Sequence, residues 1–378
     1  MDMQKKGQII MQSPIDYKKF YRVDTDIKSY YEKIIEASPK DPQETARTRD
    51  AEGTIPQSAR DKMFNISAEI KNLFHEFGSP MPPLMEGCTV LDLCCGSGRD
   101  TYLAAQLVGE SGKVIAVDPD EEKIAVAQKY FDQEMKQFGY ASPNVEFHVG
   151  VPEDLSFVDD ASIDIVISNC TFNLSPDKEA YIEEVFRVLK DDAEWYFTDV
   201  FTDRRIPYDI AQDINNRAQR LGGAMFVGDF RRLVQSKGFR DPRYLMNWKT
   251  PLTEDEQKIY GDVVFATLTI RIMKSVWSED VCENYGEKVT YDGSLPDYPD
   301  FFLFEYNIKF PAGQSFPVCG NVTTVAQHSR YAKIFKVDGD RSVHLGDTHK
   351  AYDALIINAP DFSGVADEDD QPIQASCC

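Results

Sequence analysis

The chain has 378 residues, of which 42% are apolar and 12% aromatic, so it can bury a sizeable core and has the composition of a folded protein. Its 41 basic and 63 acidic residues give a net charge of −22, which argues against nucleic acid or an anionic membrane as a partner. No apolar run approaches the roughly 18 residues of a membrane span, and the N-terminus lacks a secretory signal pattern. We therefore expect a cytoplasmic protein whose eight cysteines are thiols rather than disulfides.

Helices and strands alternate along most of the chain. Apolar residues at helical spacing and strand-length apolar runs follow one another, with a Pro- and Gly-rich stretch at 78–87 before the first strand. Such alternation predicts an α/β fold with a doubly wound, mostly parallel sheet. The predicted helices are 26–35, 61–77, 99–111, 121–139 and 177–190, and the predicted strands are 88–93, 113–118, 144–150, 163–169 and 193–200.

The pattern changes near Ser275, where apolar and polar residues alternate between turn residues. This change predicts a smaller β-rich C-terminal domain, which we expect to cover the crevice of the first domain without adding a catalytic group. The predicted organisation is a helical segment and cap over 1–87, a cofactor-binding domain over 88–274, the β-rich domain over 275–365 and an acidic tail over 366–378.

The stretch "LDLCCGSGRD" at the end of the first strand predicts a nucleotide site. Gly96 and Gly98 form a tight turn into a helix, and the next strand ends at Asp118, which can accept both hydroxyls of a ribose. NAD-binding loops place a third glycine three positions after Gly98, and this chain does not. The spacing therefore favours S-adenosylmethionine over a dinucleotide, although lone glycine turns also occur for packing reasons alone.

Further residues of the predicted cofactor site lie at the ends of the first four strands. The turn after the third strand can hydrogen-bond an adenine amino group, with Val151 or Leu155 against the ring. Cys94 stands where such loops have a glycine, which is tolerable if its backbone angles are ordinary. The complete predicted set is Asp92, Cys94, Gly96, Gly98, Arg99, Asp118, Pro119, Val151, Glu153 and Asn169.

These motifs resemble those of the arsenite methyltransferases. The resemblance rests on "DLCCGSGRD", "ISNCTFNLSPDKEAYIEEVFRVLK", "YFTDVFTDRRIP" and "LGGAMF", and covers about Ser29 to Lys274, with a looser likeness through the paired cysteines at the C-terminus. It implies a class I methyltransferase fold, S-adenosylmethionine as cofactor, and arsenic held by thiolates while its lone pair attacks the methyl group. Soft thiolates suit such a metalloid.

The chain departs from the family at the positions that the resemblance assigns to arsenic ligands. The N-terminal stretch has no cysteine, Ser79 follows the Phe77-Gly78 pair, and Arg220 precedes the "LGG" motif, so Cys170 alone matches. Adjacent Cys94 and Cys95 are expected to point in alternate directions and not to replace the missing ligands. No metal site is expected.

Three functional interpretations stay open. The first is a methyltransferase that acts on arsenicals with Cys170 and unaligned thiols. The second is a methyltransferase for another small molecule, and the third is a cofactor-binding pseudoenzyme. We prefer the second, because an arginine suits an anionic acceptor. The predicted acceptor-site residues are Ser79, Cys170, Asn173 and Arg220.

Overall fold

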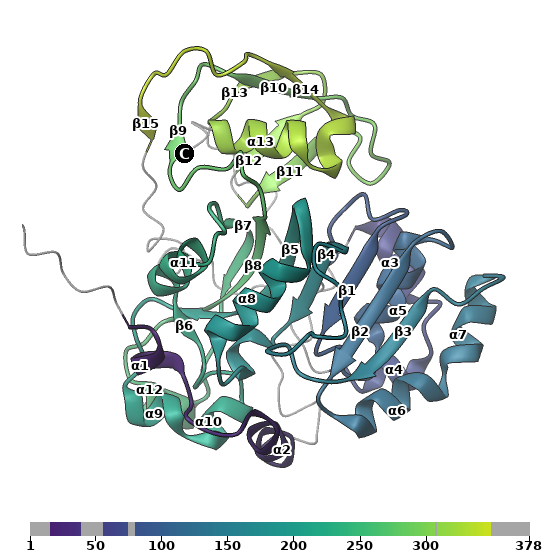
Figure 1. Ribbon diagram of the computed structural model, residues 1–378, viewed down its shortest axis with the longest axis vertical. Coiled ribbons are helices and arrows are strands. Elements are labelled where there is room, and N and C mark those ends of the chain that lie inside the picture. The colour runs from purple at the N-terminus through teal and green to yellow at the C-terminus, as the bar shows by residue number, and fades with distance from the viewer. Residues whose placement is uncertain (1–15, 39–55, 75–79, 307, 349–378) are drawn as a thin grey trace, which may run out of the picture.

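The computed structural model describes residues 16–38, 56–74, 80–306 and 308–348. Figure 1 shows a central twisted sheet with helices on both faces and a smaller C-terminal part above one edge of that sheet. Within the described residues, no helix is both long and apolar enough to span a bilayer.

The central sheet has the strand order β3-β2-β1-β4-β5-β8-β7, and β6 pairs with β5. Strands β1 to β6 run parallel to one another wherever they pair. Strand β8 is antiparallel to both β5 and β7. The predicted doubly wound, mostly parallel α/β sheet is therefore confirmed. The strands are β1 (Thr89–Leu93), β2 (Lys113–Asp118), β3 (Val145–Val149), β4 (Ile163–Asn169), β5 (Leu189–Thr202), β6 (Met225–Phe226), β7 (Arg243–Lys249) and β8 (Phe265–Met273).

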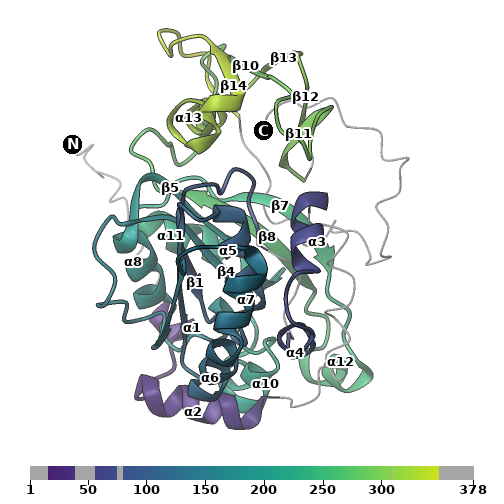
Figure 2. The same ribbon diagram turned by 90° about the vertical axis from the view of Figure 1, so that its right-hand side faces the viewer.

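Helices cover the two faces of the sheet, as Figure 2 shows from the side. One face packs against α3 (Gln57–Met63), α4 (Ala68–Asn72), α5 (Arg99–Val108), α6 (Glu121–Lys129) and α7 (Phe131–Phe138). The other face packs against α8 (Lys178–Val188) and α11 (Val227–Ser236) in the largest apolar cluster. Because both faces are covered, β1, β4 and β5 are almost completely buried, as parallel strands usually are.

The remaining helices of this part lie near the carboxyl ends of the strands or beside the antiparallel strands. They are α1 (Lys18–Tyr21), α2 (Ile27–Ala37), α9 (Tyr208–Gln212), α10 (Ile214–Ala218) and α12 (Glu254–Tyr260). Helix α2 begins where the Asp26 carboxylate accepts the N–H of Ser29 at 2.9 Å, which satisfies a donor that the first turn leaves open. Tyr30 and Ile34 of α2 pack against Ala218 of α10, so the two helices form one unit.

Two predicted long helices are each divided. The helix predicted at 61–77 is α3 and α4, and its last three residues lie outside the described part. Ser67, between α3 and α4, donates its N–H to the buried Glu134 carboxylate at 3.0 Å, so a tertiary contact ends the helix. The helix predicted at 121–139 is α6 and α7, which meet at Tyr130 with φ −96° and ψ 0°.

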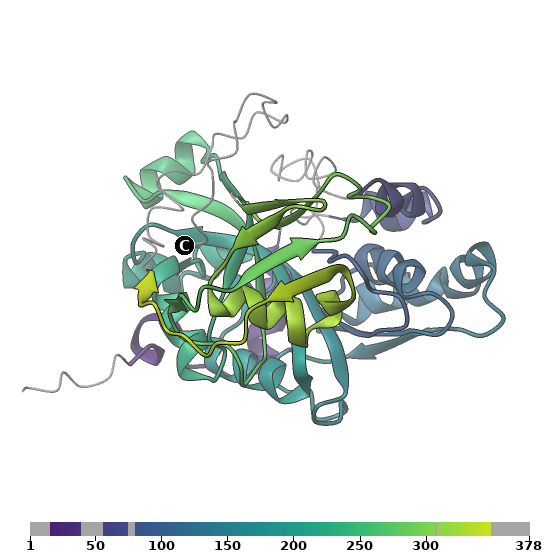
Figure 3. The same ribbon diagram turned by 90° about the horizontal axis from the view of Figure 1, so that it is seen from above.

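The C-terminal part combines a three-stranded antiparallel sheet and two antiparallel pairs with helix α13 and a short 3-10 helix (Arg330–Ile334) around its own apolar core. Figure 3, seen from above, shows these elements lying over the edge of the central sheet. Its elements are β9 (Cys282–Glu283), β10 (Lys288–Tyr291), β11 (Phe301–Glu305), β12 (Ile308–Pro311), β13 (Ser315–Pro317), α13 (Gly320–His328), β14 (Phe335–Asp338) and β15 (Asp347–Thr348).

Candidate active site

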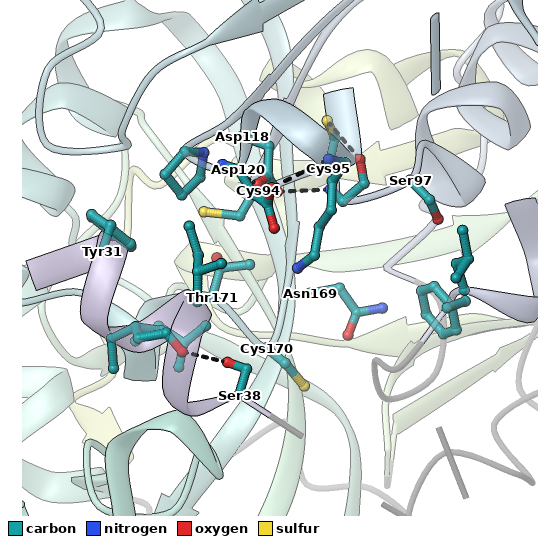
Figure 4. Close-up of a pocket in the computed structure, with 18 of the residues that line it drawn as sticks. Tyr31, Ser38, Cys94, Cys95, Ser97, Asp118, Asp120, Asn169, Cys170 and Thr171 are labelled. Carbon is teal, nitrogen blue, oxygen red and sulfur yellow. Dashed lines mark hydrogen bonds between the residues drawn. The ribbon is translucent and has the colours of Figure 1, made fainter. Parts of the chain in front are cut away.

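A cavity of about 440 Å³ lies at the carboxyl ends of β1, β2 and β4. The strand order reverses between β1 and β4, and ligands of doubly wound sheets bind at that point. Figure 4 shows residues from these strand ends facing Tyr31 of α2 across the cavity. The sequence-predicted residues that line it are Asp92, Cys94, Gly96, Asp118, Pro119, Asn169, Cys170 and Arg220.

The loop between β1 and α5 requires its glycines for two different reasons. Gly96 has φ 57°, and a Cβ added there would meet no protein atom within 4 Å, so the loop leaves open space beside the cavity. Gly98 has φ 93°, and a Cβ would lie 3.1 Å from Ala127 and 3.2 Å from Tyr102. Gly96 thus keeps the backbone accessible to a ligand, and Gly98 allows close packing of α5 against α6.

Asp118 ends β2 and fixes the loop above it. Its two carboxylate oxygens accept the N–H groups of Gly96 and Asp120, each at 2.8 Å. Burial raises the pKa of Asp118 above its ordinary value, while Lys123 and the two backbone donors oppose that shift. Each oxygen keeps further acceptor capacity, so the carboxylate can also receive hydroxyl groups from a ligand.

Asp92 and Asn169 lie at the ends of the neighbouring strands β1 and β4. Asp92 accepts the Thr101 hydroxyl at 2.6 Å, and burial followed by the nearby Asp100 raises the pKa of Asp92 to about 8. Asn169 donates its amide to the Asp100 carboxylate at 3.1 Å. Carboxyl groups and an amide therefore converge on the cavity, and a cation bound there would favour the ionised form of Asp92.

Arg99 does not line the cavity but supports it from behind. Its guanidinium pairs with Asp100 at 2.5 Å and lies 3.1 Å from the ring centroid of Phe74. Asp100 and Phe74 both line the cavity. Arg99 thus positions two lining residues instead of meeting a ligand itself.

The expectation of ordinary backbone angles at Cys94 is wrong, because Cys94 has φ 54°. Its side chain lines the cavity, and burial, with Asp118 next in order, holds the pKa of its thiol well above the ordinary value. Cys95 also contacts the cavity, but it packs with Ala116 and Ile124 beneath the loop.

Val151 and Glu153, predicted at the cofactor, do not line the cavity. Val151 packs with the apolar cluster of α2 and α10. The Glu153 carboxylate accepts the hydroxyls of Tyr31 at 3.2 Å and Ser175 at 2.5 Å, and burial raises its pKa to about 7. The turn after β3 therefore holds α2 in place, and α2 contacts the cavity.

Only two of the four predicted acceptor residues are seen to line the cavity. Cys170 and Arg220 line the cavity, with φ 56° and 66°. Asn173 lies behind them, where its amide donates to the backbone oxygens of Val200 at 2.7 Å and Arg220 at 3.2 Å. Ser79 lies outside the described residues.

The cavity is also lined by residues of the cap and of the α5 N-terminus that the sequence pattern did not predict. Tyr31 and Ile34 of α2, and Ala218 of α10, come from segments distant in sequence from the strand ends. Asp100 could have been found, because it belongs to the quoted "GSGRD" stretch. In the parts of the chain that the structure describes, no three His, Cys, Asp or Glu side chains are arranged to hold a metal ion.

The prediction that the C-terminal domain covers the crevice is contradicted for residues 275–306 and 308–348. None of these residues lines the cavity. Arg330, for example, pairs with Glu194 near the start of β5 and donates to the Pro83 carbonyl that precedes β1. The cavity is covered instead by α2 and α10.

Known proteins share both the sequence and the fold. Residues 84–254 match a family model described as a methyltransferase domain, and residues 284–378 match one for the arsenite methyltransferase C-terminal domain. An arsenite methyltransferase of Aquipseudomonas alcaligenes is 38% identical over 85% of this chain and 92% of that protein. The human arsenite methyltransferase is 32% identical over 83% and 84% of the two chains.

A solved structure agrees with these relatives. An arsenic(III) S-adenosylmethionine methyltransferase from Chlamydomonas reinhardtii superposes with a TM-score of 0.75, at 35% identity, over 78% of this chain and 100% of that chain. The match confirms S-adenosylmethionine as cofactor. The chain therefore belongs to the arsenite methyltransferase family and is an S-adenosylmethionine-dependent methyltransferase.

Proposed function

We propose that the protein transfers the methyl group of S-adenosylmethionine to a small-molecule acceptor held between Cys170 and Arg220, and that arsenite is methylated slowly. The observation that carries this proposal is the composition of the acceptor end of the cavity. Three of the family's positions for arsenic ligands can be located in this sequence, and two of them, a thiol at Cys170 and a guanidinium at Arg220, line the cavity. The third, Ser79, lies outside the described residues.

The cavity has the groups that the cofactor requires. Bound S-adenosylmethionine supplies an electrophilic methyl group on a sulfonium centre. Asp118 would accept its ribose hydroxyls, Asp92 lies where a cationic amino group is attracted, and Gly96 leaves room beside the backbone. The covering helix α2 limits water near the reacting atoms, which favours transfer to the acceptor over hydrolysis.

The other lining thiols are poorly suited to arsenite. Burial raises the thiol pKa of both Cys94 and Cys95 well above the ordinary value, so both thiols hold their protons at neutral pH. The thiolate is the form that binds metals and metalloids. A cage of three thiolates is therefore disfavoured at the cavity, and one thiol holds trivalent arsenic only weakly.

Arg220 gives the acceptor end a positive charge. Burial raises the pKa of Asp199 to about 7, and the Arg220 guanidinium is one of the groups that oppose this shift. A carboxylate on the acceptor could pair with Arg220 through two hydrogen bonds. A neutral arsenite molecule gains nothing from such a charge.

Arsenite methylation is the second candidate, and the relatives favour it. Proteins named arsenite methyltransferases match most of this chain at 32–38% identity. If this candidate is right, thiols outside the family positions must supply the missing ligands. Cys377 and Cys378 could do so, and both lie outside the described residues.

Label transfer from radioactive S-adenosylmethionine separates the two candidates. Arsenite, methylated trivalent arsenicals and a panel of thiols, amines and carboxylate-bearing acceptors are each incubated with the enzyme. We expect slow transfer to arsenite and faster transfer to an acceptor that carries an anionic group. Arg220→Met should raise the KM for that acceptor by roughly tenfold or more, as expected when a charged hydrogen-bonding partner is lost.

Matched thiol variants give the control. Cys170→Ser should reduce transfer, whereas Cys88→Ser should not, because Cys88 is a partly buried thiol that does not line the cavity. Rapid arsenite methylation that survives Cys170→Ser would contradict the proposal and would direct attention to Cys377 and Cys378.

A further inference from the structure

A buried polar cluster surrounds Arg243 where β7 meets the C-terminal part. The Arg243 guanidinium donates from Nη2 to the sulfur atoms of Cys282 and Cys319, each at 3.4 Å. Nε contacts the Asp241 carboxylate at 2.5 Å, and Nη1 contacts Glu305 at 3.3 Å. The side chain of Arg243 is only 2% exposed, so all of these contacts are made away from water.

The two sulfur atoms converge from separate segments of the chain. Cys282 belongs to β9, Cys319 is the N-cap of α13, and they are 39 and 76 residues from Arg243 in sequence. Both are buried, with 4% and 3% exposure, and neither forms a disulfide. Since both contact one nitrogen atom, the sulfurs are at most about twice the hydrogen-bond distance apart.

The two sulfur atoms lie between the Arg243 guanidinium and the start of helix α13, where Cys319 is the N-cap. The carboxylates of Asp241 and Glu305 are hard ligands, whereas two close sulfurs are soft ligands. The site therefore selects a soft, thiol-seeking centre that can bind two sulfurs at once.

We propose that Cys282 and Cys319 form a second thiol site that binds a trivalent arsenical with two exchangeable ligands, R–As(OH)₂. Two As–S bonds form and two As–O bonds break. Each thiol proton leaves with a hydroxide as water, so two waters are released and arsenic stays trivalent. The ligand would link β9 to the start of α13, and Arg243 would move off the sulfurs.

The site is separate from the catalytic cavity and has a route of entry. The cavity lies at the carboxyl ends of the strands, whereas Arg243 begins β7, which runs in the same direction as β5, and so lies at the amino ends. Figure 1 shows β7 beneath the C-terminal part. Cys282 pairs with Thr348 in a two-stranded ladder whose strands have only two residues each. Such short pairs open locally at little cost, which would expose Cys282.

Phenylarsine oxide tests this proposal, because its trivalent arsenic has two exchangeable positions. The full chain carrying Cys377→Ser and Cys378→Ser is treated with one equivalent, with S-adenosylhomocysteine present to occupy the catalytic cavity. Remaining thiols are alkylated in urea, so that buried thiols without arsenic also react, and peptide mapping identifies the protected cysteines. We expect Cys282 and Cys319 to be protected together, and Cys88 and Cys170 to be alkylated.

Single substitutions test whether both sulfurs are needed. Cys282→Ser and Cys319→Ser should each weaken binding of phenylarsine oxide by about 100-fold or more, since the second bond of a chelate forms intramolecularly. A serine hydroxyl can still accept from Arg243, so these variants should fold, as urea unfolding can verify. Protection of only one cysteine, or equal binding to the wild type and both variants, would overturn the proposal.

Discussion

Three non-glycine residues that line the cavity have left-handed backbone angles. Cys94, Cys170 and Arg220 have φ of 54°, 56° and 66°, a region that costs an L residue about 1–2 kcal/mol. Backbone strain of this kind often persists at functional sites, where the surrounding structure fixes it. Residue identity alone does not reveal it, which is why the expectation for Cys94 failed.

The strain at Cys94 predicts an unusual order of stability for two variants. Cys94→Gly should be more stable than Cys94→Ala by about 1 kcal/mol, because glycine avoids the left-handed penalty and its greater unfolded-state entropy offsets only part of that gain. Urea unfolding of both variants measures the difference. The same pair of substitutions at Cys88, which is not among the positive-φ residues, should favour alanine. A Cys94→Ala protein more stable than Cys94→Gly would disprove strain at this position.

Asp118 is predicted to contribute strongly to cofactor affinity. Asp118→Ala removes the carboxylate that fixes Gly96 and faces the cavity, so binding of S-adenosylhomocysteine should weaken by about 1.5–3 kcal/mol for each charged hydrogen bond lost. Titration calorimetry measures this change. Asp132→Ala, on the exposed side of α7, serves as the control and should leave affinity unchanged. Equal affinities for all three proteins would remove Asp118 from the cofactor site.

At the residue scale, the sequence predicted positions at strand ends better than side-chain directions. Asp92, Asp118 and Asn169 end β1, β2 and β4, and parallel strands bring their carboxyl ends to one edge. Val151 and Glu153 follow a turn instead, and they point toward α2. The packing of a distant helix decides that direction, and no local pattern in the sequence records it.

Helix α2 shows how one element can close a site from outside the sheet. Tyr31 lines the cavity and donates its hydroxyl to Glu153, which also accepts from Ser175. The helix is thus attached to the turn after β3 and to the segment after β4. This attachment includes a carboxyl group whose charge changes near neutral pH.

The raised pKa of Glu153 predicts that stability depends on pH. The unfolded chain releases this proton near pH 4.3, whereas the folded chain keeps it until about pH 7, so the free energy of unfolding falls as pH rises through that window. Glu153→Gln removes this titration. The free energy of unfolding of the variant minus that of the wild type should therefore increase by roughly 2–3 kcal/mol between pH 4.5 and 8.

Urea unfolding at several pH values checks this expectation. The exposed Glu121→Gln serves as the control for loss of a carboxyl group at the surface. A Glu153→Gln difference that stays constant, or that decreases with pH, would show that the carboxyl group is not held protonated behind α2.

At the element scale, the sequence predicted the alternation but not every boundary. The central parallel strands were found because they are apolar and short, and their neighbours are helical. Strands β7 and β8 were not predicted, since they form an antiparallel pair outside the regular alternation. The break between α3 and α4 depends on Glu134 of α7, a contact that a local pattern cannot show.

Over the whole molecule, the two ends of the parallel strands have different roles. The carboxyl ends line the cavity, and the other end of the sheet contacts the C-terminal part. Arg330 is central to that attachment, because it pairs with the buried Glu194 at 2.5 Å and contacts the Pro83 carbonyl at 3.1 Å. Stability and cofactor binding should therefore be separable by substitution.

Arg330→Met is predicted to lower stability without changing cofactor affinity. Removing one partner of a buried ion pair costs about 3–5 kcal/mol, because Glu194 would stay buried without its cation. The dissociation constant for S-adenosylhomocysteine should stay within about twofold, as expected for distant sites. Urea unfolding and calorimetry measure the two quantities.

An exposed ion pair provides the comparison. Lys258→Met removes a partner of Asp255, and both side chains are largely exposed, so stability should change by less than about 1 kcal/mol. If Arg330→Met weakened cofactor binding tenfold or more, the two ends of the sheet would be coupled.

The contact between β7 and the C-terminal part also bears on self-association. Strand β7 is the last strand of the central sheet, and the Tyr244 carbonyl accepts the N–H of Tyr306 at 3.0 Å. Sheet edges with open hydrogen-bonding groups recruit strands from other molecules, and proteins avoid aggregation by covering them. The C-terminal part covers this edge, so its loss would leave a chain that joins with its own copies through β7 even while the distant cavity stayed intact.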